Sequence, residues 1–264
     1  MSSINDIYGR KLTEIRVDYQ ISCSYDFELS FPHNVSIPRP YPPRMSTPLL
    51  YSQIYFASIA EELQISKETA IILDDMRFLT TSVVRHVDRT LSDEEISKLW
   101  TTSTWIQDRI SAMPNGNDPA SHLTTDYIYK ACRIAALLYC KAIVQRTPLS
   151  RVCTMQDLNQ LWVNMWRVTL TRWKQIPGVF LWILFSANPA AQETPHGRFL
   201  KSMLKATSSY LALDYWDIVD GASMAYAKLQ RWLRREAAGM EAVAVGMGVA
   251  KAERDMSFLH NYKR

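Results

Sequence analysis

Residues 128–143 have the sequence IYKACRIAALLYCKAI, and this pattern predicts a long helix at the centre of the protein. Apolar residues recur every three or four positions, which places them on one face of an α-helix. They are Ile128, Cys132, Ala135, Tyr139 and Ile143. The small side chains of Ala131, Ala135 and Ala136 would let another helix approach closely. We therefore expect this helix to be central in an all-α fold.

Two amphipathic helices are predicted before the central one. Apolar residues recur at helical spacing first in residues 72–87 and then in residues 96–113. The positions are Ile72, Met76, Leu79, Val83 and Val87, then Ile96, Leu99, Ile106, Ile110 and Met113. Ser92 with Glu95 is a capping-box pattern at the start of the second helix, and Pro114-Asn115-Gly116 marks its end.

A row of large apolar side chains follows the break at Thr147-Pro148. Its spacing of three or four residues predicts one helical face, and we expect that face to belong to the core rather than to a cofactor site. The row consists of Leu158, Trp162, Trp166, Leu170 and Trp173.

More helices are predicted in the last third of the chain. Residues 179–185, VFLWILF, favour a short buried helix, since a bilayer-spanning helix needs roughly 20 apolar residues. Thr194-Pro195 has the pattern of an N-cap followed by proline, and predicts a helix that continues through Phe199, Met203 and Leu204. The last helix has an apolar face made of Ile218, Ala222, Ala225, Leu229 and Trp232.

Composition agrees with a single multi-helix domain. The chain has 264 residues, 47% of them hydrophobic, with only 8 Gly against 13 Tyr, 11 Met and 8 Trp. Six prolines between Pro32 and Pro48 prevent regular helix there. We therefore predict an extended proline-rich leader at 1–49, a helical domain at 50–236 and a weakly patterned tail at 237–264.

Charge, cysteines and the N-terminus limit the function classes. The formal net charge of +4 is modest, and interleaved signs give no electrostatic footprint for nucleic acid. The four cysteines form no close CxxC pair, so we expect reduced core thiols rather than a zinc site or a disulfide framework. They are Cys23, Cys132, Cys140 and Cys153. Polar residues at 2–6 argue against a secretory signal.

The adjacent acids Asp74-Asp75 are the first candidate site. On a helix they are similar to the Mg²⁺-binding aspartates of class I terpene synthases, which are also all-helical. That longer motif has another acid three residues after Asp75, where this chain has Phe78. Successive helical residues also diverge by about 100°. A solvated acid pair is therefore the favoured interpretation.

Other candidate residues lack the partners that their chemistry would need. His196 at a helix start would suit a general base, but no nucleophile is visible beside it. The histidines at 33, 86, 122 and 260 lack the spacing of metal ligands. Gly246-Met247-Gly248 has neither a preceding strand nor a third glycine. We therefore assign no catalytic, cofactor-binding or metal-binding residue, and predict no cofactor and no enzyme activity.

Residues 228–235, KLQRWLRR, combine basic and aromatic side chains. Such a segment could bind phosphate or belong to a nuclear import signal. Because Leu229, Trp232 and Leu233 fit an apolar face, an amphipathic helix end is the favoured interpretation.

Several segments, in order, resemble the regulatory domain of fungal-specific transcription factors. They cover roughly residues 50–235, and no single one is diagnostic. The segments are 73–79 LDDMRFL, 131–139 ACRIAALLY, 161–162 LW, 166–167 WR, 172–174 RWK, 177–184 PGVFLWIL, 194–199 TPHGRF and 229–233 LQRWL.

The resemblance implies an all-helical regulatory domain in the nucleus, with the cytoplasm as a second location. In that family it follows a binuclear zinc cluster held by six cysteines, whereas this chain has one cysteine before residue 132. We therefore expect no sequence-specific DNA binding by this chain alone. Regulation would pass through a co-regulator, a zinc-cluster factor or a small apolar ligand. We expect no membrane association.

Two alternatives remain open. One is an all-helical enzyme acting on a hydrophobic, prenyl diphosphate-like substrate through Asp74 and Asp75. The other is a dimerising partner that titrates full-length factors. The sequence leaves open the target genes, the effector, activation or repression, the oligomeric state, and whether Met1 is the true start.

Overall fold

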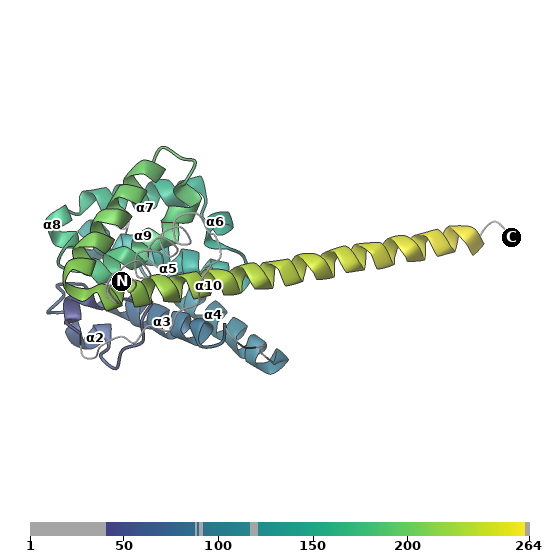
Figure 1. Ribbon diagram of the computed structural model, residues 1–264, viewed down its shortest axis with the longest axis horizontal. Coiled ribbons are helices and arrows are strands. Elements are labelled where there is room, and N and C mark those ends of the chain that lie inside the picture. The colour runs from purple at the N-terminus through teal and green to yellow at the C-terminus, as the bar shows by residue number, and fades with distance from the viewer. Residues whose placement is uncertain (1–40, 88, 90–91, 117–120, 262–264) are drawn as a thin grey trace, which may run out of the picture.

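The computed structural model describes residues 41–261, apart from residues 88, 90–91 and 117–120. In the last helix only the backbone is described at residues 212–214, 216 and 241–261. The described residues are all-α, as predicted, with α-helices, short 3₁₀ helices and no strand (Figure 1). No helix among them is both long enough and apolar enough to cross a bilayer.

The first helices form one side of the body. They are η1 (Pro43–Met45), α2 (Phe56–Ile59), α3 (Lys67–Val84), α4 (Asp93–Ala112) and η2 (His122–Thr125). The apolar positions predicted in residues 72–87 are all buried. At the start of α4, Ser92 and Glu95 form the predicted capping box, and the helix ends one residue before Met113.

The predicted central helix is α5 (Tyr127–Gln145), and it is central. It packs against α3, α4, α6 (Leu149–Val152), α7 (Met155–Arg167) and α9 (Pro177–Ala191). All five residues of its predicted apolar face are buried. The small Ala131, Ala135 and Ala136 are fully buried too, as expected where helices approach closely.

Helix α9 contains the VFLWILF segment and is buried around its whole circumference. Every residue except Ala190 is buried, including polar Ser186 and Asn188. Trp182 stacks on Tyr139 of α5, with ring centroids 5.4 Å apart, and the Tyr139 hydroxyl donates to the Trp182 carbonyl. The prediction of a short buried helix is confirmed.

The last helix, α10 (Gly197–Asn261), begins later than Thr194-Pro195 predicted. Thr194 Oγ1 donates to the Ala191 carbonyl at 2.8 Å, so this hydroxyl closes the end of α9 instead of capping α10. Within α10, Tyr215 has non-helical angles (φ −144°, ψ 60°), and two successive helices meet there. The predicted apolar face, from Ile218 to Trp232, is buried against α9 and α3.

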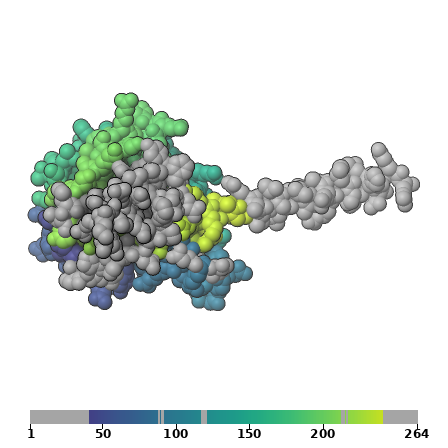
Figure 2. Space-filling view, viewed as in Figure 1, coloured from purple at the N-terminus to yellow at the C-terminus, as the bar shows by residue number. Residues whose placement is uncertain are grey.

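Beyond the body, α10 continues as one projecting helix. The backbone is helical to Asn261, through the region predicted as a weakly patterned tail. Figure 1 shows this part (yellow) leaving the body as a single helix. In Figure 2 its last described side chains lie at the edge of the body, above the blue surface that includes α4.

The end of the predicted leader contributes to the core. Residues 1–40 lie outside the described residues, but Met45, Leu49 and Leu50 are buried, and η1 packs on α9. The contact is close because Gly178, in the first turn of α9, has no side chain. A Cβ there would lie 2.5 Å from the Ser46 carbonyl oxygen and closer still to that of Met45.

We predict that Gly178→Ala lowers the free energy of unfolding by about 1–3 kcal/mol, because backbone must move to admit the methyl group. Gly239→Ala is the matched control. It lies in a helix with nothing within 4 Å of the added methyl group, and should stabilise by about 0.5–1 kcal/mol. Urea denaturation of both variants would measure this, and equal effects would contradict the proposed contact.

Candidate functional site

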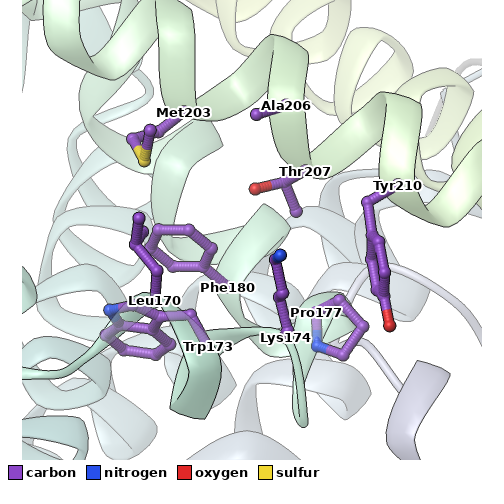
Figure 3. A pocket seen from close by; sticks show the side chains of 9 residues that line it. All are labelled: Leu170, Trp173, Lys174, Pro177, Phe180, Met203, Ala206, Thr207 and Tyr210. Carbon is purple, nitrogen blue, oxygen red and sulfur yellow. The ribbon is translucent and has the colours of Figure 1, made fainter.

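A groove opens between the first turns of α10, residues 203–210, and the segment formed by α8 (Leu170–Trp173) and the start of α9. Its volume is about 230 Å³, and its lining is predominantly apolar. Figure 3 shows side chains from the two walls facing each other across it. They are Leu170, Trp173, Lys174, Pro177 and Phe180 on one side, and Met203, Ala206, Thr207 and Tyr210 on the other.

Two stacked aromatic rings fix one wall. The Trp173 and Phe180 rings lie 4.4 Å apart between centroids and are inclined by only 13°. Trp173 Nε1 donates to the Met165 carbonyl at 3.1 Å, so the buried indole has its hydrogen bond. Thr169 caps the single turn of α8 by accepting from the Arg172 backbone N–H. The ring stack and this hydrogen bond thus hold Trp173 and Phe180 in the wall of the groove.

The polar groups of the groove are few. Lys174 lies at the mouth, and its Nζ is 5.7 Å from the centre of the Tyr210 ring. In Figure 3 the Lys174 chain extends between the two walls, and the Thr207 hydroxyl lies on the facing wall. No described carboxylate is within ion-pair distance of Lys174.

A second hollow of about 170 Å³ continues the groove past Leu170. It shares Leu170, Trp173 and Phe180 with the first and adds Trp166 and Phe199. No acidic or basic residue lines it. The two hollows adjoin at these three shared residues, and we treat them together as an apolar groove whose one lining cation, Lys174, lies in the first hollow.

An aromatic cluster lies beside the second hollow and shares Trp166 and Phe199 with its lining. Trp162 stacks on Trp166 at 5.7 Å and meets Phe199 edge-on at 4.3 Å. The His196 ring packs on Trp162, and its Nε2 is 2.7 Å from Asn159 Oδ1. His196 is therefore part of a packed cluster of side chains.

The prediction that the tryptophan row is a core face is wrong in part. Trp173 is buried, but Trp166 and Leu170 are 66% and 56% exposed. The row does not share one helix, because α7 ends at Arg167 and Thr169 caps a new turn. The buried positions of α7 are instead Leu158, Leu161 and Met165. Sequence spacing alone gave no sign of the break.

Asp74 and Asp75 are engaged by neighbouring protein groups rather than fully solvated. The two Asp74 oxygens accept backbone N–H groups of Phe56 (2.8 Å) and Ala57 (3.0 Å), at the start of α2. Asp75 Oδ1 accepts from Arg109 Nη1 at 3.0 Å. Burial raises the pKa of the Asp75 carboxyl, against the opposing effect of the Arg109 guanidinium.

Arg77 completes this interaction network. Its Nη1 donates to the Ile54 carbonyl, and its guanidinium lies over the Phe56 ring, 4.1 Å from the centroid. Burial lowers its pKa. Asp74 and Arg77 thus hold the chain before α2 against α3.

We predict that Asp74→Ala destabilises the fold by about 1–2 kcal/mol, since two backbone donors at the start of α2 lose their acceptor. Glu62→Ala, at an exposed position close in sequence, should change stability by no more than about 0.5 kcal/mol. Thermal unfolding of the two variants distinguishes them. An unchanged melting temperature for Asp74→Ala would show that the two acceptor contacts carry no stability.

The described histidines are separated from one another. The His86 ring contacts Arg89, and His122 Nε2 is 3.7 Å from Glu68. His33 and the side chain of His260 lie outside the described residues. Among described residues, no three His, Cys, Asp or Glu side chains lie grouped as metal ligands.

Three of the four predicted core thiols are described, and they are free. Cys132 and Cys140 are buried, and Cys153 is partly buried. Burial raises the pKa of the Cys140 and Cys153 thiols to about 12 and that of Cys132 well above its usual value. Cys23 lies outside the described residues.

We predict that these thiols resist alkylation in the folded protein. Because the thiolate is the reactive form and pKa values are near 12, less than about 1% is ionised at pH 8. Mass spectrometry after iodoacetamide treatment of a Cys23→Ser variant should find little modification until urea is added. Rapid modification of Cys140 without denaturant would contradict the buried site.

The basic segment at 228–235 belongs to a packed helix. Leu229, Trp232 and Leu233 are buried, which confirms the predicted apolar face. Arg235 Nη1 donates to the Val87 carbonyl at 3.0 Å, so this end of the segment ties α10 to the region after α3.

Comparisons with known proteins add no relative. Family models, curated proteins and solved structures were each searched, and none gave a significant match. Sequence reasoning assigned no pocket residue. Periodicity carried no signal for the groove, because its two walls come from separate segments, residues 170–180 and 203–210.

Proposed function

We propose that this chain is a helical regulatory domain of the transcription-regulator type, which responds to a small apolar molecule and acts through protein partners. The observation that carries the proposal is the apolar groove along the part of α10 before Tyr215. The ordered resemblance of residues 50–235 to fungal regulatory domains supplies the regulatory class and the nuclear location.

The position of the groove suits a sensor. One wall is fixed by the Trp173–Phe180 stack, and the other is the part of α10 before the non-helical Tyr215. A ligand that fills the groove favours one position of that part of α10. Because α10 continues out of the body, a change at the groove has a direct route to the projecting helix and to a partner bound there.

The enzyme alternative receives less support. Metal-binding aspartates must direct oxygen atoms at the ion, whereas both Asp74 oxygens accept backbone N–H groups and Asp75 pairs with Arg109. For the dimerising alternative, no described surface favours a second copy of the chain over another partner. The regulatory proposal therefore rests on the groove.

The test fuses the full chain to an unrelated DNA-binding domain and measures a reporter gene with intermediate basal expression. Ala206→Trp places an indole in the groove from an exposed position, and should change reporter output by roughly fivefold or more. Lys205→Trp, one residue away and outside the groove lining, is the matched control and should behave as the unmodified fusion.

Thermal unfolding would show that both variants remain folded. A fusion that never differs from the DNA-binding domain alone would contradict the regulatory function. Equal outputs of the two tryptophan variants would contradict a role for the groove.

A further inference from the structure

We infer that the groove binds an apolar molecule with one carboxylate, such as a medium-chain fatty acid, with the carboxylate at Lys174 and the chain directed toward Trp166. This inference names the ligand class for the site of the proposed function, and rests on that function only for its regulatory meaning.

Size sets the first limit on the ligand. An apolar protein cavity on the order of 150 Å³ holds one benzene molecule. The groove has about 230 Å³ and is continued by a hollow of about 170 Å³ that shares three of its residues. By this comparison it takes a molecule of roughly ten to fifteen non-hydrogen atoms.

Shape sets the second limit. The first hollow, lined by Pro177, Trp173 and Phe180, adjoins the second, to which Trp166 and Phe199 contribute. Two adjoining apolar hollows suit an extended chain better than a compact ring system. An apolar chain gains about 0.8 kcal/mol for each buried CH₂ group, and most of the lining offers no polar partner.

Charge sets the third limit. Lys174 is the one charged residue in the lining of the two hollows. It lies at the mouth, exposed enough to keep a wet head group, with Thr207 as a hydroxyl donor on the facing wall. An ammonium and a hydroxyl with no carboxylate beside them favour an anionic oxygen group. A single cation matches a monoanion better than a phosphate dianion.

The contact with Tyr210 holds the Lys174 ammonium near the groove mouth, where it can bind a carboxylate. The ring, 5.7 Å from Nζ, attracts the ammonium to the groove mouth without neutralising its charge. A carboxylate can then approach the ammonium from the groove side. The other end of the ligand lies beside Trp166 and Phe199, where the lining offers no charged partner for a carboxylate. The orientation is therefore fixed with the head group at Lys174.

The test is equilibrium dialysis of the full chain with radiolabelled decanoate, below its micelle concentration, and in parallel with decanol. We expect one decanoate per chain, and decanol binding weaker by roughly tenfold or more, because it lacks the charge that Lys174 recognises. Lys174→Met keeps an apolar side chain of similar length, and should weaken decanoate binding roughly tenfold while leaving decanol binding unchanged.

Two controls separate the site from the rest of the surface. Lys205→Met removes the same charge from a neighbouring exposed position outside the lining, and should leave decanoate binding within about twofold. Ala206→Trp should abolish binding of both ligands by filling the groove. Lys205 and Ala206 are both exposed, so we expect Lys205→Met and Ala206→Trp to remain folded, and a loss of binding then reports on the groove itself.

Equal binding of decanoate and decanol, equal effects of Lys174→Met and Lys205→Met, or no binding of decanoate would each overturn the inference. The reporter experiment is independent of these outcomes. If Ala206→Trp changes reporter output but decanoate does not bind, the groove serves regulation with another occupant. If decanoate binds as expected but no reporter response exists, the ligand class stands and the regulatory function fails.

Discussion

The absence of a polar face on α9 is the constraint on which the rest of the structure depends. Fourteen of its fifteen residues are buried, so it must be covered on every side. The α10, α5, α6, α7 and η1 segments provide that cover. Full burial of each large side chain is worth about 1.5–3 kcal/mol, which makes the position of α9 decisive for every helix around it. Close contacts at its two ends need glycine, at Gly178 for η1 and at Gly197 beside the Ala191 carbonyl.

The groove lies at the start of α9, where the segments that cover this helix leave part of it uncovered. At the start of α9, Pro177 and Phe180 face both the core and the gap under α10, and the single turn of α8 is too short to fill that gap. Trp173 belongs to both environments, since its indole N–H is satisfied inside the fold while its ring forms the groove wall. The same packing that buries α9 therefore leaves an open apolar surface next to it, with Lys174 at the mouth.

The parts of α10 before and after Tyr215 have different partners. After Tyr215 the helix is held by buried contacts of Leu229, Trp232 and Leu233, and by Arg235 bound to the Val87 carbonyl. Before Tyr215 it forms one wall of the groove. The non-helical Tyr215 therefore separates the part of α10 that faces the groove from the part that packs on the body. Lys174, on the wall opposite α10, faces the part of this helix that precedes Tyr215.

The sequence by itself determined the class of fold and most of its helices. Local periodicity and capping are properties of neighbouring residues, so the faces of α3, α5 and α9 and the capping box of α4 were predictable. The tertiary structure decided which side chains contact one another across different helices, and residue spacing does not carry that information. Asp74 and Asp75 were predicted to be a solvated pair, but they accept hydrogen bonds from the start of α2 and from Arg109. The last helix, α10, was predicted to start at Thr194-Pro195, but it starts at Gly197. The tertiary structure also divided the tryptophan row between core and surface. The contacts of the two aspartates join segments far apart in the chain, which a local pattern cannot place next to one another. The start of α10 depends instead on the Thr194 hydroxyl, which bonds to the Ala191 carbonyl rather than capping the next helix.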